Sequence, residues 1–129
     1  MIVKNDRMIG RTKSRLSELK SVRPCTTKHG MMRFRQRVAT DADRKNVREF
    51  LMLGRFMTPK EQKDYGLNKI SHKFTIRKLR KYLSLGIHSY LGAVIVNLPN
   101  IDVVSPVLIQ EHEDWINIKA YTFLLFRWE

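Results

Sequence analysis

Few residues in this chain are available for cross-links, redox chemistry or a membrane span. The 129 residues include one cysteine, Cys25, which cannot form an internal disulfide and leaves no cysteine pair for a structural zinc site. No stretch approaches the roughly twenty apolar residues of a membrane helix, and the N-terminal segment lacks the apolar run of a signal peptide. We therefore expect a protein of the reducing cytoplasm without a membrane partner.

Proline, glycine and acidic residues are also scarce. The four prolines and six glycines are scattered as single turn residues, so no linker is evident. Twelve Asp and Glu stand against 25 Lys and Arg, which leaves a formal net charge of +13. This excess repels itself unless an anionic partner relieves it, so a polyphosphate is the expected partner. The alternative is a surface that is basic only for solubility, which acidic residues generally serve better.

The length and the hydrophobic content of 43% fit one domain with one core. Residues 1–24 are rich in Lys and Arg, and we expect them to form a basic arm with a short helix near residues 14–22 that Pro24 ends. Residues 25–129 would then form a single domain. Apolar spacing and capping residues predict helices after Thr26 or Thr27, after Thr40–Asp41, after Thr58 with Glu61 completing a capping box, and over residues 71–86.

The last third of the chain predicts strands. Residues 88–98, 101–110 and 115–128 are rich in β-branched and aromatic residues, and turn-like segments at Pro99-Asn100 and residues 111–114 separate them. Pro106 should mark a strand edge or a bulge. The expected fold is α+β, with N-terminal helices packed on one face of a small C-terminal antiparallel sheet.

The most informative segment for function is the predicted helix that follows Thr27. His29, Arg33 and Arg37 are spaced by four residues, so they project from roughly one helix face. Arginine offers forked donors to a phosphate, and histidine transfers protons near neutral pH. A phosphodiester is therefore a sensible ligand. Gly30 weakens this turn by nearly 1 kcal/mol relative to alanine, and a helix that began after Gly30 would lose the alignment of His29 with Arg33.

The H-x-x-x-R-x-x-x-R pattern resembles a helix of the small RelE-like ribonuclease-fold proteins (barnase, EndoU, colicin and RelE type), which include phage endoribonucleases and toxins. The resemblance covers about a dozen residues. It implies metal-independent RNA cleavage with no cofactor, in which the 2′-hydroxyl attacks the adjacent phosphate. His29 would then move a proton, Arg33 would stabilise the transition state and Arg37 would orient the backbone. Tyr121 or Arg127 of the last strand would approach this helix. RNA is thereby favoured over DNA, with the ribosome or a protein inhibitor as further partners.

A second basic element, residues 73–81, has an apolar side and presents its cations elsewhere. With the helix after Thr58 it also matches a helix-turn-helix, so the alternative function is a noncatalytic DNA-binding regulator, and a third is a basic inhibitor or ribosome-associated adaptor. Metal chemistry at Asp102, Glu111 and Lys119, or at residues 111–114, has no diagnostic spacing. The predicted nucleic-acid contacts besides His29 and Arg33 are Arg35, Arg37, Lys73, Arg77, Lys78, Arg80 and Lys81.

Overall fold

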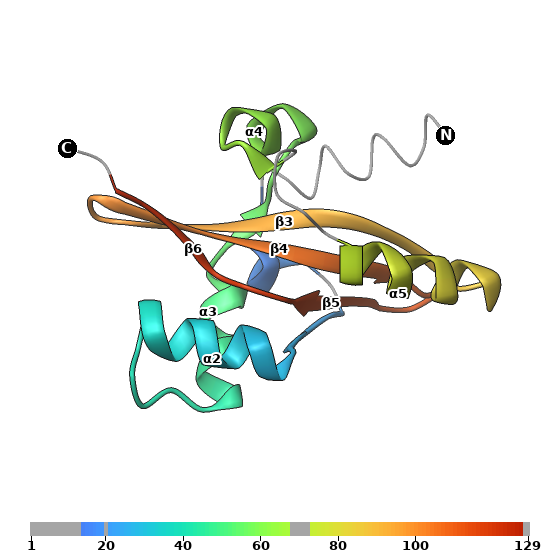
Figure 1. The fold of residues 1–129 in the computed structure, drawn as a ribbon, viewed down its shortest axis with the longest axis horizontal. Helices are drawn as coiled ribbons and strands as arrows, with labels where there is room; N and C mark the ends of the chain where they lie inside the picture. The colour runs from blue at the N-terminus through green and yellow to red at the C-terminus, as the bar shows by residue number, and fades with distance from the viewer. Residues whose placement is uncertain (1–13, 20, 68–72, 128–129) are drawn as a thin grey trace.

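The computed structural model describes residues 14–19, 21–67 and 73–127, with the backbone alone for residues 73–75. These residues form an α+β fold, as the sequence predicts, with a six-stranded and mostly antiparallel sheet (Figure 1). The elements follow the order η1 (Leu16–Glu18, a 3₁₀ helix), β1 (Val22–Thr26), α2 (Lys28–Arg37), α3 (Arg44–Met52), β2 (Arg55–Phe56), α4 (Pro59–Asp64), α5 (Lys73–Ser84), β3 (His88–Leu98), β4 (Ile101–Glu111), β5 (Ile116–Ala120) and β6 (Leu124–Arg127).

A long hairpin of β3 and β4 forms the centre of the sheet. The two strands pair from His88↔Glu111 to Leu98↔Ile101, and Pro99 and Asn100 join them, as predicted. The strand order is β1-β5-β4-β3-β2, and β6 pairs with the part of β4 that β5 leaves free. β1 runs parallel to β5, whereas the other pairs are antiparallel.

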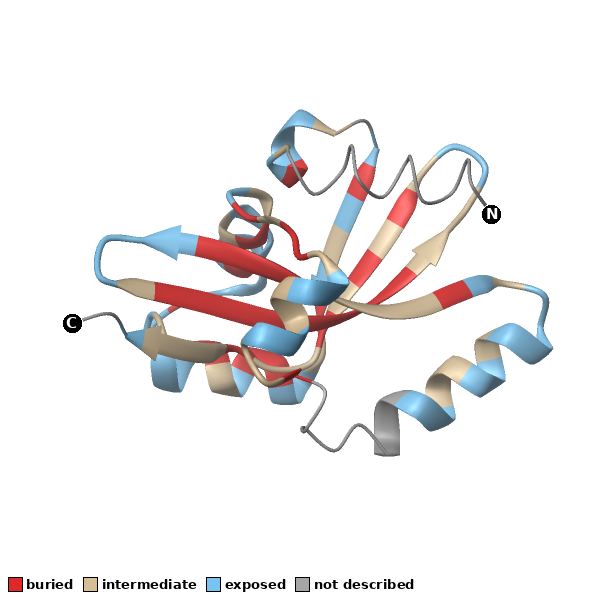
Figure 2. Cartoon of the chain, turned by 90° about the horizontal axis from the view of Figure 1, so that it is seen from above, coloured by how far each residue is buried: buried red, intermediate tan, exposed pale blue. Residues whose placement is uncertain are grey.

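One face of the sheet carries the larger core. Alternate residues of β3, β4 and β5 point to this face, where α2, α3 and η1 pack on them. Figure 2 shows the buried segments concentrated along the middle of the long strands. The helices and the strands contribute to this core the buried side chains of Leu16, Val22, Met31, Phe34, Ala42, Val47, Leu51, Phe56, Val94, Val96, Val103, Val107, Ile109, Ile116, Ile118, Ala120 and Phe123.

The opposite face carries a second, smaller core around α4. Ala93, Ile95 and Val104 point to this face, and Met57 and Leu67, which flank α4, cover them. The expectation that the helices pack on one face is therefore wrong, because α4 and its flanks bury the other face (Figure 1). The sheet is apolar on both sides along β3 and β4, so each side needs a cover.

The N-terminal segment differs from the predicted arm. Where the sequence predicts a helix over residues 14–22, the structure has only the short η1, and Val22 begins β1. Leu16 is completely buried, and its N–H donates to the Gly54 carbonyl at 2.8 Å. Pro24, which was expected to end a helix, lies inside β1, an edge strand where proline is tolerated. Residues 1–13 of the predicted arm lie outside the described residues.

The predicted strand over residues 115–128 is divided into β5 and β6. The break lies opposite Pro106, which is in the interior of β4 rather than at a bulge. Ser105 Oγ donates to the Thr122 carbonyl at 2.8 Å, and the Tyr121 N–H donates to the Pro106 carbonyl at 3.3 Å. Pro106 has no N–H to donate, so it is accommodated where β4 changes its neighbour from β5 to β6.

Capping residues explain where the helices begin. Thr27 caps α2 and Thr58 caps α4, both as predicted, whereas α3 begins after Asp43 rather than Thr40–Asp41 because Asp43 and Asn46 form a capping box. Glu61 completes the box of α4 and also accepts two hydrogen bonds from the Arg55 guanidinium. These bonds to Arg55 lower the pKa of Glu61 to about 2.

Gly30 allows α2 to begin directly against the sheet. A Cβ at this position would overlap Thr26 Oγ1 and would lie 2.8 Å from the carbonyl oxygen of Ala120. The same carbonyl accepts hydrogen bonds from Thr26 Oγ1 and from the Thr27 N–H, both at 3.1 Å. The space for a side chain is therefore already occupied by the polar contacts that join β1, β5 and α2.

We predict that Gly30→Ala destabilises the protein. The added methyl should lower the free energy of unfolding by about 1–3 kcal/mol, as overpacking commonly does, although alanine is the better helix former by about 1 kcal/mol. Urea denaturation followed by far-UV circular dichroism measures the change. The control is Gln36→Ala on the exposed side of the same helix, and equal stability of the two variants would contradict the prediction.

Candidate nucleic-acid interface

Helix α2 carries cations and no carboxylate. Its ten residues include Lys28, Arg33, Arg35 and Arg37, together with His29. Because the helix begins at Lys28, His29 lies in its first turn and the spacing of four to Arg33 is kept. The expected weakness at Gly30 is offset by the Thr27 cap, whose side chain accepts from the Gly30 N–H at 3.0 Å.

His29 and Arg33 lie in contact on the exposed side of α2. Arg33 Nε donates to His29 Nε2 at 3.4 Å, and Arg33 NH1 donates to Gln36 Oε1 at 3.1 Å. Arg33 Nε can only donate, so His29 Nε2 is the acceptor in this contact. The structure thus places a proton acceptor beside a guanidinium, and solvent can reach both.

The other arginines of α2 bind backbone carbonyls. Arg37 NH1 donates to the Phe123 carbonyl at 2.7 Å, which ties the end of α2 to the connection between β5 and β6. Arg35 Nε donates to the Ala42 carbonyl at 2.8 Å, which ties α2 to the loop before α3. The structure therefore brings His29 and Arg33 together but directs the Arg37 guanidinium to a structural contact.

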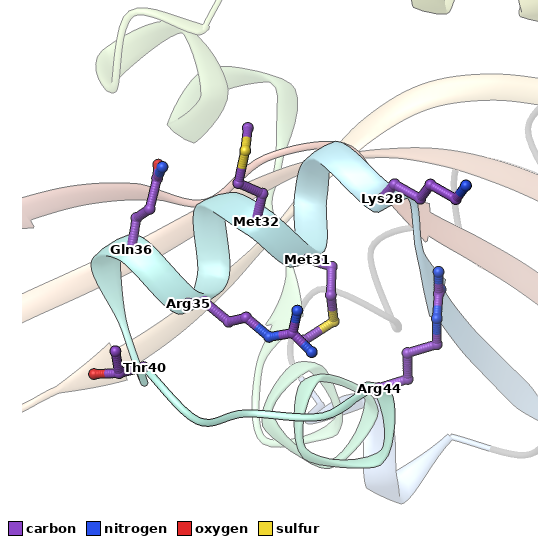
Figure 3. Close-up of a pocket in the computed structure, with 7 residues that line it drawn as sticks. All are labelled: Lys28, Met31, Met32, Arg35, Gln36, Thr40 and Arg44. Atoms are coloured by element: carbon purple, nitrogen blue, oxygen red, sulfur yellow. The ribbon is translucent and has the colours of Figure 1, made fainter.

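A hollow of about 470 Å³ lies on α2 beside the start of α3. Its lining residues are Lys28, Met31, Met32, Arg35, Gln36, Thr40 and Arg44 (Figure 3). Three of these are cations and none is a carboxylate. Figure 3 shows Met31 and Arg35 directed toward α3, with the head groups of Lys28 and Arg44 near each other at one end. Arg44 NH1 also donates to the Thr26 carbonyl at 2.9 Å.

Lys28 and Arg44 line the hollow but were not among the residues predicted from the sequence. Arg44 lies on a different helix from the predicted motif, and the loop of residues 38–43 returns the chain so that α3 begins beside α2. The short loop between α2 and α3 was the signal in the sequence that could have placed the two helices side by side.

Helix α5 forms a second basic element. Arg77, Arg80 and Lys81 are exposed, whereas Lys78 Nζ lies 6.0 Å from the centre of the Tyr121 ring. The side chain of Lys73 lies outside the described residues. Figure 2 shows α5 extending along the margin of the sheet. Within the described residues α4 and α5 share no extended interface, and each of them contacts β3.

Tyr121 and Arg127 are not brought to His29 by any described contact. The Tyr121 hydroxyl is buried, finds no hydrogen-bond partner among the described side chains, and lies beneath α5. Burial raises the pKa of Tyr121 to about 12, so this hydroxyl stays protonated at neutral pH. Arg127 is exposed at the end of β6, opposite Ile101.

The acidic residues weighed for metal chemistry lie apart. Asp102 and Glu111 occupy opposite ends of β4, where Asp102 accepts from Tyr65 and Asn97, and Glu111 accepts from Tyr90. In the part of the chain that the structure describes, no three His, Cys, Asp or Glu side chains gather as metal ligands do. No described helix has the length and apolar character needed to cross a membrane.

Comparison of the chain with models of protein families, with curated proteins and with solved structures finds no match in any of the three. The resemblance of the His29 helix to the RelE-like proteins therefore stays a prediction. The proposed function is therefore based on the side chains described above.

We predict that Arg37 stabilises the fold and that Arg33 does not. Arg37→Ala removes the hydrogen bond to the Phe123 carbonyl and should lower the free energy of unfolding by about 1 kcal/mol. Arg33→Ala removes only contacts with other side chains on the surface of α2. It should change the free energy of unfolding by less than about 0.5 kcal/mol. Urea denaturation of both variants measures the difference, and an equal loss of stability would refute this division of roles.

Proposed function

We propose that this protein binds RNA through the surface formed by α2 and the start of α3. The observation that carries the proposal is the placement of Lys28, Arg35 and Arg44 around one hollow with no carboxylate in its lining. Lysine and arginine side chains that neutralise phosphates displace the salt cations condensed on a nucleic acid. The release of these ions into solution supplies affinity for the backbone. The net charge of +13 adds long-range attraction.

The cations that line the hollow keep their charge, which supports this assignment. Arg35 and Arg44 donate to carbonyl oxygens, which fix their positions, and neither forms an ion pair with a carboxylate among the described residues. Lys28 has no described carboxylate partner. A fixed guanidinium loses less conformational entropy on binding a phosphate than a free one does.

The DNA-binding alternative has less support. A helix-turn-helix needs its first helix packed against the recognition helix, and the described parts of α4 and α5 pack on the sheet separately. The cations of α5 instead suit a second contact with a phosphate backbone, which is compatible with a free RNA or with the ribosome.

We predict that RNA binding depends on Lys28 and Arg44 in a salt-dependent way. The double variant Lys28→Gln/Arg44→Gln should bind a fluorescein-labelled RNA about tenfold more weakly at low salt, and the slope of log affinity against log salt should fall by about 1.4 for two lost contacts with a single strand. The matched control is Lys60→Gln/Lys63→Gln on α4, which removes the same charge from another helix. Equal losses in both double variants would show that charge alone, and not this surface, binds RNA.

The contact between His29 and Arg33 favours a second function, metal-independent cleavage of the bound RNA. On binding, Arg33 would turn from His29 to the phosphate oxygens, and the freed Nε2 of His29 would accept the proton of a 2′-hydroxyl as its oxygen bonds to the adjacent phosphorus. Arg33 would stabilise the negative charge on the phosphate oxygens. The bond from phosphorus to the 5′-oxygen then breaks, this oxygen takes a proton from the imidazolium, and the products are a 2′,3′-cyclic phosphate and a 5′-hydroxyl. DNA lacks the attacking hydroxyl, which is why RNA is the proposed substrate.

We predict cleavage of end-labelled RNA in the presence of EDTA. His29→Ala and Arg33→Ala should each lower the rate at least about a hundredfold, since proton transfer by a positioned side chain contributes that much or more. Arg48→Ala, which removes an exposed cation of α3, is the control and should retain the rate. Unchanged cleavage by the His29 and Arg33 variants, or no cleavage by the purified protein at any concentration, would refute this second function and leave binding as the function.

A further inference from the structure

We infer that the hollow on α2 holds an unstacked nucleobase, so that the protein selects single-stranded over double-stranded RNA. This inference rests on the proposed RNA binding and assigns a substrate class to the same surface. Its basis is that the hollow combines apolar, hydrogen-bonding and cationic side chains in separate places, as a nucleotide requires.

The floor of the hollow suits the face of a base. Met32 supplies a polarisable thioether, which makes favourable contacts with aromatic rings, and the buried Met31 lines the hollow from the core. Met32 is 44% exposed although it is a large apolar residue. Arg35 adds a planar guanidinium that its bond to the Ala42 carbonyl holds in place, and such a plane stacks on aromatic faces. The volume of about 470 Å³ lies within the range of small-molecule sites and exceeds the needs of a single base.

The polar residues of the lining are suited to the edge of a base. Gln36 Oε1 accepts from Arg33 NH1, so the amide is oriented and its NH₂ group remains as a donor. Thr40 adds a hydroxyl that both donates and accepts. Through Gln36, the hollow is also linked to the guanidinium that contacts His29.

The cations indicate where the backbone would pass. Lys28 and Arg44 lie together at one end of the hollow, and Thr40 lies at the other (Figure 3). Phosphates bound at Lys28 and Arg44 would leave the adjoining base free to enter the hollow beside Met32. In an A-form duplex the bases are stacked and paired, and the groove edges alone are presented to a protein. A duplex could contact the cations but could not fill the hollow.

The experiment compares the affinities of one fluorescein-labelled ten-nucleotide RNA as a single strand and as a duplex with its complement. Fluorescence anisotropy is measured with the full chain, in EDTA, with the 2′-hydroxyls methylated so that cleavage does not intervene. We expect the wild type to bind the single strand about tenfold more tightly, because stacking of a base on protein side chains contributes in this range. The double variant Gln36→Leu/Thr40→Leu narrows the hollow and removes its polar groups without changing a charge, so this ratio should fall to about one.

Gln62→Leu on α4 is the matched control for the loss of an amide and should keep the wild-type ratio. Thermal melts of all variants confirm that each is folded at the assay temperature. RNA binding without a preference for the single strand, or a preference that survives in Gln36→Leu/Thr40→Leu, would overturn the base site while leaving the proposed RNA binding intact. Failure of the wild type to bind either RNA would overturn both.

Discussion

The carbonyl oxygen of Ala120 fixes the start of α2, the helix that carries the proposed RNA-binding surface. It accepts from Thr26 Oγ1 and from the Thr27 N–H, and a Cβ at Gly30 would lie only 2.8 Å from it. These contacts join the last residue of β5, the end of β1 and the first turn of α2 at one point. Because the first turn is fixed, His29, Arg33 and the hollow along α2 have fixed positions relative to the sheet. A helix that began one turn later would keep the cations but would lose this arrangement.

The sheet separates two kinds of surface. α2 and α3 cover one face and present a hollow with cations, whereas α4 covers the other face and has its carboxylate Glu61 paired with Arg55. Glu61 therefore neutralises a cation beside α4 and Glu49 pairs with Lys45 on α3, whereas α2 has no carboxylate of its own. The cations of α2 are thus the ones that the proposed polyanion would neutralise.

Local patterns predicted the elements whose causes are local. The Thr58 and Glu61 capping box, the Thr27 cap and the Pro99-Asn100 connection were visible as residue types at fixed spacing, and the structure confirms them. β1 was not visible, because its partner β5 lies more than ninety residues away and a basic segment ending in proline gives no local strand signal. The last predicted strand is divided opposite Pro106, where β4 changes its neighbour from β5 to β6. This change depends on the pairing of β4, β5 and β6, which the local sequence does not reveal.

The residues of the candidate site were predicted where their placement depends on local helix geometry, and missed where it depends on distant segments. The spacing of His29 and Arg33 follows from helix geometry alone, and the structure places them in contact. The roles of Arg35 and Arg37 depend on carbonyls of other segments, which no spacing along α2 reveals. Arg44 joins the site only because α3 packs beside α2. Tyr121 was expected near His29, but it lies beneath α5.

Arg35, Arg37 and Arg44 hold segments of the chain together through neutral acceptors. A carbonyl dipole orients a guanidinium without cancelling its charge, so the native state concentrates like charges that the unfolded chain would spread apart. Any polyanion that binds this surface therefore also screens repulsion inside the folded molecule. Ligand binding and folding are thermodynamically linked in this way, and the molecule in its bound state is more resistant to unfolding than the molecule alone.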